Sequence, residues 1–340
     1  MRDGRRLIVN LGVLLDGPAD ARDRLTGAGV AVTNGRGASE DELLASCADA
    51  EIVMGLGQFP FTDRVFAGLP RLQFLMQCTV GYDRIDVGAA TQHGVLVANS
   101  PRFCIEEVSD HAVMLLMACA RRLPQQVDAF RRQGWSRPPA VDAMGPVRRM
   151  REQTLGFVGF GKIARLTAEK MVGFGMRYLA HDPYLTPEAV RPWRVELVSL
   201  DELCRSSDFI TVHALLNAET RGILGAAQFA AMKSTAYVVN TSRGGTIDEI
   251  AMTHALREGR IAGAALDVLE QEPPHPDNPL LTLPNVLLTA HTAGHGVSSM
   301  LDNRQQSVDQ VLRFLGGLWP TALVNPEVKT HARVGRLRES

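Results

Sequence analysis

A glycine-rich turn between an apolar strand and a helix is the feature that most restricts how this 340-residue chain can fold. Residues 154–164 read TLGFVGFGKIA, so Gly159, Gly161 and Ala164 take the three small positions of a G-x-G-x-x-A turn. The residues before the turn form an apolar run, and those after it have helical spacing. A strand, a tight glycine turn and a helix together predict the opening of a βαβ unit with a parallel sheet.

The rest of the chain repeats this alternation of strand-like and helical runs. Strands are predicted at residues 7–13, 51–55, 74–77, 95–98, 155–158, 177–181, 209–213, 236–240, 263–266 and 286–289. Helices are predicted at residues 40–48, 106–122, 162–174, 201–206, 247–258 and 298–315. Ser39 and Thr246, each with a glutamate three residues later, are expected to cap two of these helices. The pattern predicts an α/β fold with two doubly wound parallel-sheet domains and ligands in the cleft between them.

Composition excludes several classes of protein. Hydrophobic residues make up 45% and charged residues 21%, which is an ordinary globular balance. The 36 Lys and Arg residues nearly match the 37 Asp and Glu residues, so the net charge of −1 gives no reason to expect a nucleic-acid partner. No apolar run approaches the roughly 18 residues of a membrane span.

Cysteine usage and the N-terminus bear on location. The five cysteines are scattered without a CxxC pair, which argues against a disulfide framework or a metal site and favours a cytoplasmic protein. A secretory signal is the alternative, because Arg2, Arg5 and Arg6 precede an apolar stretch that ends near Ala19-Asp20-Ala21. Asn10 and Gly12 interrupt that stretch, however, and favour a first β-strand.

The glycine turn has the chemistry of a dinucleotide site. Gly159 permits the tight turn, Gly161 lets the backbone approach a pyrophosphate, and the N-terminus of the following helix offers unpaired N–H groups to the anion. Asp182 ends the next predicted strand, where a carboxylate would bind a ribose 2′-hydroxyl and repel a 2′-phosphate. The sequence therefore predicts NAD as the cofactor in preference to NADP.

Three further segments, residues 239–245, 266–273 and 288–294, each follow the end of a predicted strand. They carry an arginine, glutamates and a histidine, which are the residue types needed to move a hydride and a proton on a 2-hydroxy acid. An arginine fork binds a carboxylate and polarises a carbonyl group. A histidine exchanges the hydroxyl proton near neutral pH, and a carboxylate behind it orients the ring.

These segments and the turn at Gly159 resemble the D-isomer-specific 2-hydroxyacid dehydrogenase family over nearly the whole chain. Residues 80–86 (VGYDRID), 97–101 (VANSP), 106–111 (EEVSDH) and 181–184 (HDPY) add to the resemblance, which is closest to C-terminal-binding-protein-like and phosphoglycerate-dehydrogenase-like members. It implies a flavodoxin-like substrate domain of residues 1–101 and 297–340 and a Rossmann NAD-binding domain of residues 102–296. It also implies a homodimer formed through the NAD-binding domain.

The resemblance assigns roles to individual residues. Arg243 would bind the substrate, His291 would be the acid/base and Glu272 would orient it. The backbone of Val80 and Gly81 would bind the substrate carboxylate. Contacts to the dinucleotide, besides those of Gly159, Gly161 and Asp182, are implied for Phe160, Lys162, Ile163, Ala214, Thr220, Thr241, Asp267 and Gly294.

Alternatives remain for single residues and for the function. Glu270 competes with Glu272, but Glu272 precedes a proline as the family's glutamate does; His295 is the rival of His291. His111 and His213 are expected to form hydrogen bonds within the fold. The leading function is NAD-dependent interconversion of a small D-2-hydroxy acid and its 2-oxo acid. One alternative is a dinucleotide-sensing binding protein, but C-terminal-binding proteins have tryptophan where this chain has Gly294, which disfavours it. The other alternative is a relative that oxidises an unusual substrate such as a phosphonate aldehyde.

Overall fold

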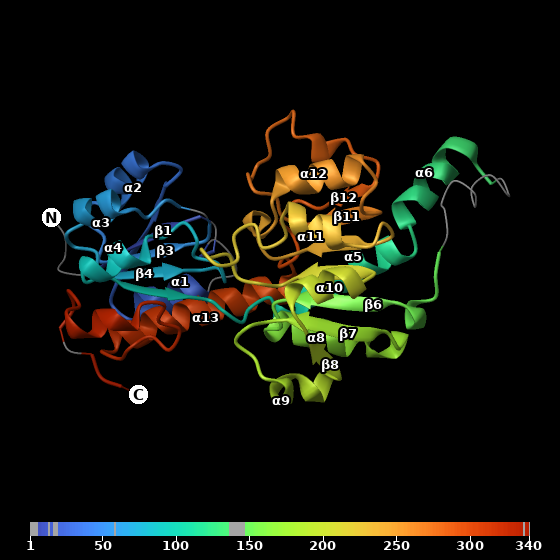
Figure 1. Cartoon of the computed structure of the whole chain (residues 1–340). Helices are drawn as coiled ribbons and strands as arrows, with labels where there is room; N and C mark the ends of the chain where they lie inside the picture. Colours follow the sequence, from blue (N-terminus) through green and yellow to red (C-terminus); the bar gives the residue numbers. More distant parts are fainter. Residues whose placement is uncertain are drawn as a thin grey trace. The chain divides into compact units, whose positions relative to one another are not determined.

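The computed structural model describes residues 6–12, 14–15, 20–57, 59–135, 147–335 and 337–339. Val13 of the first predicted strand, and Arg2, Arg5 and Ala19 of the secretory alternative, lie outside these residues. The chain divides into two compact units, Met1–Cys104 with Gly296–Ser340, and Ile105–His295 (Figure 1). The chain therefore leaves the first unit and returns to it, with boundaries up to three residues from those predicted.

The first unit is built on a five-stranded parallel sheet with the strand order β2-β1-β3-β4-β5. The chain runs outward from β1 to β2 and then back across to β3, which is the flavodoxin-like order. The strands are β1 Leu7–Leu11, β2 Ala31–Gly35, β3 Ile52–Gly55, β4 Phe74–Gln77 and β5 Leu96–Asn99. The helices are α1 Asp20–Gly27, α2 Glu40–Cys47, α3 Asp63–Gly68, α4 Val87–Gln92 and α13 Val297–Leu315, followed by the 3₁₀ turn η6 Pro326–Thr330.

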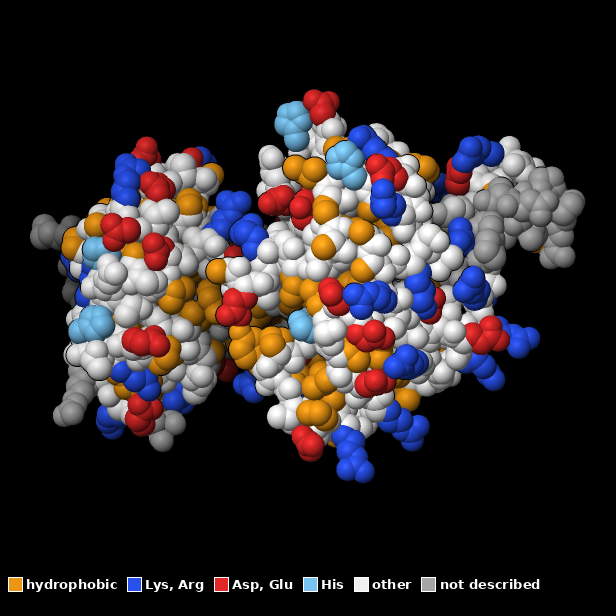
Figure 2. Space-filling model, in the orientation of Figure 1, with side chains coloured by type: hydrophobic (Ala, Val, Ile, Leu, Met, Phe, Trp, Pro, Cys, Tyr) orange, Lys and Arg blue, Asp and Glu red, His pale blue; other side chains and the backbone are white. Residues whose placement is uncertain are grey.

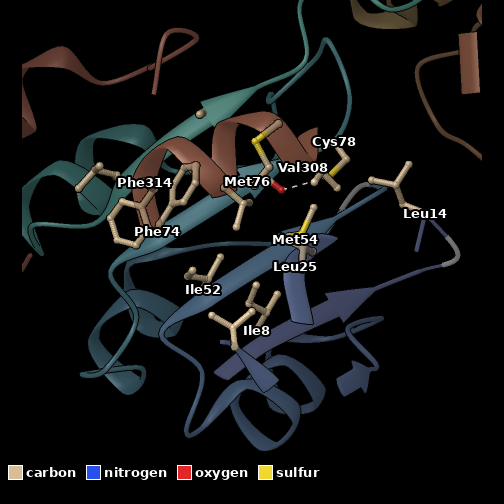
Figure 3. Close-up of a cluster of buried hydrophobic side chains, with 14 of the residues drawn as sticks. Ile8, Leu14, Leu25, Ile52, Met54, Phe74, Met76, Cys78, Val308 and Phe314 are labelled. Atoms are coloured by element: carbon tan, nitrogen blue, oxygen red, sulfur yellow. Dashed lines mark hydrogen bonds between the residues drawn. The ribbon is translucent and has the colours of Figure 1, made fainter. Parts of the chain in front are cut away.

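Alternate residues of the strands feed two separate hydrophobic clusters, one on each face of this sheet. Figure 3 shows the cluster that contains Ile52, Met54, Phe74 and Met76, against which Phe314 of α13 packs. The rings of Phe74 and Phe314 lie 5.0 Å apart, so the C-terminal helix is fixed to the N-terminal sheet. The neighbouring residues Val53 and Leu75 and their equivalents face the other cluster, with α2, α3 and α4. Burial on both faces explains why these strands are continuous apolar runs.

The second unit is a seven-stranded parallel sheet with the order β12-β11-β10-β9-β6-β7-β8. Its strands are β6 Thr154–Val158, β7 Arg177–His181, β8 Val195–Leu197, β9 Phe209–Val212, β10 Tyr237–Asn240, β11 Gly263–Leu266 and β12 Val286–Leu288. Its helices are α5 Ile105–Ala120, α6 Leu123–Gln133, α8 Lys162–Met171, α9 Pro187–Val190, α10 Leu200–Ser206, α11 Ala226–Ala231 and α12 Glu249–Arg257. Short 3₁₀ turns lie at Met150–Glu152, Val172–Phe174, Arg191–Trp193, Gly244–Thr246 and Pro279–Leu281.

The two sheets confirm the predicted fold class, an α/β chain with two doubly wound parallel sheets. Helices α5 and α8 pack on one face of the larger sheet, and α10, α11 and α12 pack on the other. The direction of strand addition reverses between β6 and β9. The carboxyl ends of strands at such a reversal point form the crevice in which doubly wound folds bind ligands.

Several local predictions were incomplete or wrong. Strands β2 and β8 were not predicted, because β2 is an edge strand with a polar sequence and β8 has only three residues. The helix expected to begin at Ile247 begins at Glu249, and Asp248 caps it by accepting a hydrogen bond from the N–H of Ala251. Thr246 instead belongs to the preceding 3₁₀ turn, and its hydroxyl donates to the carbonyl oxygen of Arg243.

The surface and the cysteines agree with the composition. Lys and Arg side chains alternate with Asp and Glu side chains over the visible face (Figure 2). All five cysteines are buried as free thiols, and burial raises the pKa of Cys47, Cys78, Cys119 and Cys204 to about 12. Among the described residues, no helix is long and apolar enough to cross a membrane.

Candidate active site

The glycine turn lies at the carboxyl end of β6, beside the point where strand addition reverses. Gly159 has a φ of +81°, and a Cβ atom there would lie 2.8 Å from the backbone nitrogen of Ala214. Helix α8 begins at Lys162 without a side-chain cap, and a Cβ on Gly161 would meet no described heavy atom within 4 Å. The turn thus has open space above an uncapped helix N-terminus, which fits a pyrophosphate.

Asp182 follows the carboxyl end of β7, next to this turn. Its Oδ2 accepts a hydrogen bond from the N–H of Phe160 at 2.9 Å, and its Oδ1 accepts from the N–H of Tyr184 at 3.1 Å. A carboxylate has about four acceptor positions, so two remain for the hydroxyls of a ribose. The carboxylate is therefore fixed beside the turn with acceptor capacity to spare.

Thr241, at the end of β10, gives a second test of whether a dinucleotide fits. Thr241 is 8% exposed, and its Oγ1 is buried without a hydrogen-bond partner among the described residues. Buried hydroxyls are normally hydrogen-bonded, so an orphaned one indicates a partner supplied from outside the chain. A ribose hydroxyl is such a partner.

The hydroxyl of Thr220, by contrast, is used within its own loop. It donates to the carbonyl oxygen of Leu215 and accepts from the N–H of Asn217 at 2.9 Å. Thr220 therefore shapes the loop that follows β9 and Ala214. The same loop carries Glu219, which accepts a hydrogen bond from the hydroxyl of Tyr184. This bond connects the loops after β7 and β9, the two strands that flank β6.

Arg243 lies in the turn after β10, and Asn240 organises that turn. The side-chain amide of Asn240 donates to the carbonyl oxygen of Arg243 at 3.0 Å, while its oxygen accepts from the N–H and the hydroxyl of Ser242. One nitrogen of the Arg243 guanidinium donates to the Ser242 carbonyl oxygen at 2.8 Å. A Cβ on Gly244 would lie 1.9 Å from the carbonyl carbon of Leu269, so only glycine lets this turn approach the segment that leads to Glu272.

Glu272 and His291 are in direct polar contact. His291 Nδ1 lies 2.5 Å from Glu272 Oε2, and Glu272 Oε1 accepts from the N–H of Leu269 at 3.1 Å. Because Nδ1 faces the carboxylate, Nε2 is left for a reactant. His291 also has a φ of +53°, a left-handed conformation that is uncommon for a histidine and typical of functional sites.

The rival residues have different surroundings. The carboxylate of Glu270 lies 3.9 Å from the guanidinium of Arg221, and the backbone N–H of Glu270 donates to the carboxylate of Glu249. His295 is exposed. The contact with His291 is therefore made by Glu272, and Arg243, Glu272 and His291 follow three neighbouring strands, β10, β11 and β12.

Asp267 is buried at the end of β11, with 2% of the residue exposed. Its carboxylate accepts from the hydroxyl of Thr289 and from the backbone N–H groups of Thr292 and Ala293, which lie between His291 and Gly294. The backbone carbonyl of Asp267 accepts from the N–H of His291 at 2.7 Å. The carboxylate of Asp267 therefore keeps about one acceptor position for the predicted contact with a dinucleotide.

Val80 and Gly81 lie in the other unit, in the loop after β4. Asn99 holds the carbonyl oxygen of Val80 at 2.7 Å, and the hydroxyl of Thr79 holds that of Gly81 at 2.7 Å. No hydrogen bond among the described residues uses the N–H of either residue. Two fixed, unpaired N–H groups suit a carboxylate.

The two other histidines form hydrogen bonds within the fold, as predicted. His111 Nε2 lies 3.0 Å from Thr289 Oγ1, and His213 Nε2 lies 3.0 Å from Thr211 Oγ1. The ring of His213 stacks on Phe157, and burial lowers the pKa of His213 to about 4.

We expect His213 to make the second unit sensitive to acid. In the unfolded chain a histidine binds its proton near pH 6.5, whereas folded His213 binds it only near pH 4. Stability is therefore lost as the pH falls from about 6.5 to about 4, by at most about 3 kcal/mol, which is the free-energy equivalent of this pKa difference. Urea unfolding at pH 7 and pH 4.5 should show a smaller loss for His213→Gln than for the wild type. The exposed His254→Gln should behave as the wild type does.

Known proteins resemble this chain in both sequence and fold. Residues 113–293 match the family model described as D-isomer specific 2-hydroxyacid dehydrogenase, NAD binding domain. A glyoxylate reductase from Korarchaeum cryptofilum is 38% identical over 290 residues, which cover 85% of this chain and 87% of that protein. A D-3-phosphoglycerate dehydrogenase from Methanocaldococcus jannaschii is 36% identical over 89% of this chain, which spans only 57% of that relative's length. The solved glyoxylate reductase from Paecilomyes thermophila has a TM-score of 0.83 and 26% identity, covering 95% of this chain and 99% of that one.

Proposed function

Since the chain belongs to the D-isomer specific 2-hydroxyacid dehydrogenase family, whose members use a nicotinamide dinucleotide, we propose that it interconverts a small D-2-hydroxy acid and its 2-oxo acid. The observation that carries this proposal is the 2.5 Å contact between Glu272 and His291 Nδ1, which leaves His291 Nε2 available to a reactant. Arg243 follows the strand next to β11, which leads to Glu272. Together, Arg243, Glu272 and His291 offer a group that can polarise a carbonyl, a proton donor and a carboxylate that orients the donor.

Each residue has a defined task in this reaction. The dinucleotide, when bound, supplies or accepts the hydride. The Arg243 guanidinium polarises the carbonyl group and pairs with the substrate carboxylate, because its planar fork matches both groups. His291 Nε2 gives a proton to the carbonyl oxygen during reduction and takes it back during oxidation. Glu272 holds the opposite ring nitrogen. We further propose that the N–H groups of Val80 and Gly81 bind a substrate carboxylate.

The dinucleotide would lie along the residues that fit it. The N-terminal residues of α8, Lys162 and Ile163, with Phe160 and Gly161 before them, would surround the pyrophosphate. Asp182 would bind the adenosine ribose, with the loop of Ala214 and Thr220 beside it. Thr241, Asp267 and Gly294 would line the nicotinamide side.

Cofactor choice depends on Asp182. We expect the wild type to use NADH with a kcat/KM at least about 100-fold higher than with NADPH, because a fixed carboxylate repels the 2′-phosphate. Asp182→Ala should narrow this ratio about tenfold or more, mostly by weakening NADH binding. Steady-state rates with both cofactors provide the measurement. Equal use of NADH and NADPH by the wild type would exclude this role for Asp182.

The test of the function itself is a panel of 2-oxo acids. Oxidation of NADH is followed at 340 nm with glyoxylate, hydroxypyruvate, pyruvate, 3-phosphohydroxypyruvate and bulkier 2-oxo acids. Turnover with at least one of them is expected, and where the product is chiral, unlike the glycolate formed from glyoxylate, it should be the D-isomer. Tight NADH binding without turnover of any substrate would instead support a dinucleotide-sensing binding protein.

We also propose that the chain forms a homodimer through its NAD-binding unit. In Figure 1, α6 extends away from the seven-stranded sheet, and it exposes Leu123, Val127 and Phe130, with Trp135 just beyond its end. An apolar helix face of this kind is typical of an interface with a second protein surface. Sedimentation should give a mass near 74 kDa, about twice the 37.0 kDa of one chain, and Phe130→Glu should shift it toward the monomer. A wild-type monomer at micromolar concentration would contradict the proposal.

We propose a cytoplasmic location as well. It is supported by five buried cysteines that remain free thiols, as expected for a reducing compartment.

A further inference from the structure

A chain of hydrogen bonds lies beneath the His291 loop, and two of its members, His111 and Thr289, have no role in the proposed reaction. It starts at His111 on α5, whose Nε2 lies 3.0 Å from Thr289 Oγ1. Thr289 Oγ1 lies 2.6 Å from Asp267 Oδ1, and Asp267 accepts the N–H groups of Thr292 and Ala293 at 2.9 Å each. The chain thus connects the helix that packs on the sheet with the residues immediately after His291.

The chemistry of these groups fixes the direction of every hydrogen bond. The carboxylate of Asp267 accepts from the N–H groups of Thr292 and Ala293 and also from Thr289 Oγ1, so the single hydroxyl proton of Thr289 is used in that bond. Thr289 Oγ1 must then accept from His111, which places a proton on His111 Nε2. Each member therefore has one defined role, and removing the Thr289 hydroxyl breaks the chain on both sides.

Asp267 connects this chain of hydrogen bonds to the backbone of His291 and of the two residues that follow it. The carboxylate is almost completely buried, where an ionised group needs donors on all sides. Three donors come from the His291 loop and from Thr289, and His111 Nε2 lies 3.6 Å away. The same residue receives the N–H of His291 on its backbone oxygen, which helps to hold His291 at its positive φ. The loop and the carboxylate stabilise each other.

We propose that His111 and Thr289 are positioning residues that hold Asp267, and through it the backbone of residues 291–293, so that His291 stays on Glu272. The proposal rests on the proposed function only in taking His291 as the proton donor. Asp267 keeps about one acceptor position for a carboxamide, so positioning the loop and contacting the cofactor are compatible tasks.

The experiment compares Thr289→Val with Thr289→Ser. Valine has nearly the same shape without the hydroxyl, whereas serine keeps the hydroxyl. Amide hydrogen exchange of Thr292 and Ala293 is measured by NMR on the protein without added cofactor. Thr289→Val should raise both exchange rates at least about tenfold, and Thr289→Ser should leave them within about threefold of wild type. Amides of Ile8 and Val9, in the other unit, serve as the internal reference.

A second pair of variants guards against a general loss of stability. His111→Leu removes the donor, while His111→Gln offers an amide N–H in its place. We expect the leucine variant to raise exchange in residues 292–293 and the glutamine variant to restore protection in part. Unchanged exchange of Thr292 and Ala293 in both Thr289→Val and His111→Leu would overturn the proposal.

Kinetics separate this inference from the proposed function. Thr289→Val should lower kcat about 10- to 100-fold with KM and the NADH dissociation constant within about threefold, because a displaced proton donor slows the reaction without removing a binding group. If the wild type turned over no 2-oxo acid, the proposed function would fail while exchange still decided the positioning role. If the wild type were active and Thr289→Val retained full kcat with normal exchange, only the positioning role would fail.

Discussion

Replacing Arg243 by lysine is expected to lower kcat for 2-oxo acid reduction about 100- to 1000-fold. The guanidinium offers two parallel N–H donors to a carboxylate and a further one to the carbonyl oxygen, whereas an ammonium group is a point charge with no fixed fork. Loss of one donor to a developing oxyanion costs a factor of this size in other enzymes. Lysine retains the positive charge, so a fall in kcat of this size would show that the planar geometry of the guanidinium, and not its charge alone, is needed.

The variant should still bind its cofactor. Arg243 follows β10, whereas the glycine turn follows β6 and Asp182 follows β7, so the NADH dissociation constant measured by fluorescence should change less than about threefold. Arg205→Lys is a matched control, because the ion pair of Arg205 with Asp201, one helical turn away, is exposed. Turnover of Arg243→Lys within a factor of three of wild type would remove Arg243 from the mechanism.

The architecture could be predicted from the sequence because its signals are local and repeated. Each buried strand is an apolar run, and the turn at Gly159 joins a strand to a helix within eleven residues. Strand β8 could not be found in this way, since its three residues Val195–Leu197 carry no periodicity and pair only with the edge of β7. The start of α12 was misjudged because Thr246 and Asp248 are both good capping residues, and tertiary contacts of the Arg243 turn occupy Thr246.

The site was less accessible to sequence reasoning than the fold. The residue types of Arg243, Glu272 and His291 could be chosen from their positions after strands, and the proline after Glu272 favoured it over Glu270. Asn240 and Gly244 were missed as supports of Arg243, although an asparagine at a strand end before S-R-G-G is a recognisable turn signal. The link from His111 through Thr289 to Asp267 joins residues up to 178 positions apart, so nothing local predicts it.

Replacing Glu272 by glutamine is expected to lower kcat about 10- to 100-fold in both directions, although the two side chains have the same size. The two carboxylate oxygens have separate partners: Oε2 accepts from His291 Nδ1 and Oε1 accepts from the N–H of Leu269. Both partners are donors, and an amide has only one acceptor oxygen. If its oxygen accepts from Leu269, its NH₂ group faces His291 Nδ1, where it either opposes an N–H or holds the neutral ring in the tautomer with the proton on Nε2, which cannot take up the substrate proton during oxidation.

The charge lost with Glu272 adds to this effect, because a charge-assisted hydrogen bond is roughly twice as strong as a neutral one. Glu270→Gln is the matched control: it removes the same charge two residues away, where the carboxylate forms an exposed pair with Arg221 at 3.9 Å. Its kcat should stay within about twofold of wild type. Steady-state reduction and oxidation rates for both variants, with the best substrate of the panel, make the comparison. If Glu270→Gln lost the greater part of kcat and Glu272→Gln did not, the carboxylate that supports His291 during turnover would be Glu270, and the 2.5 Å contact would not represent the working arrangement.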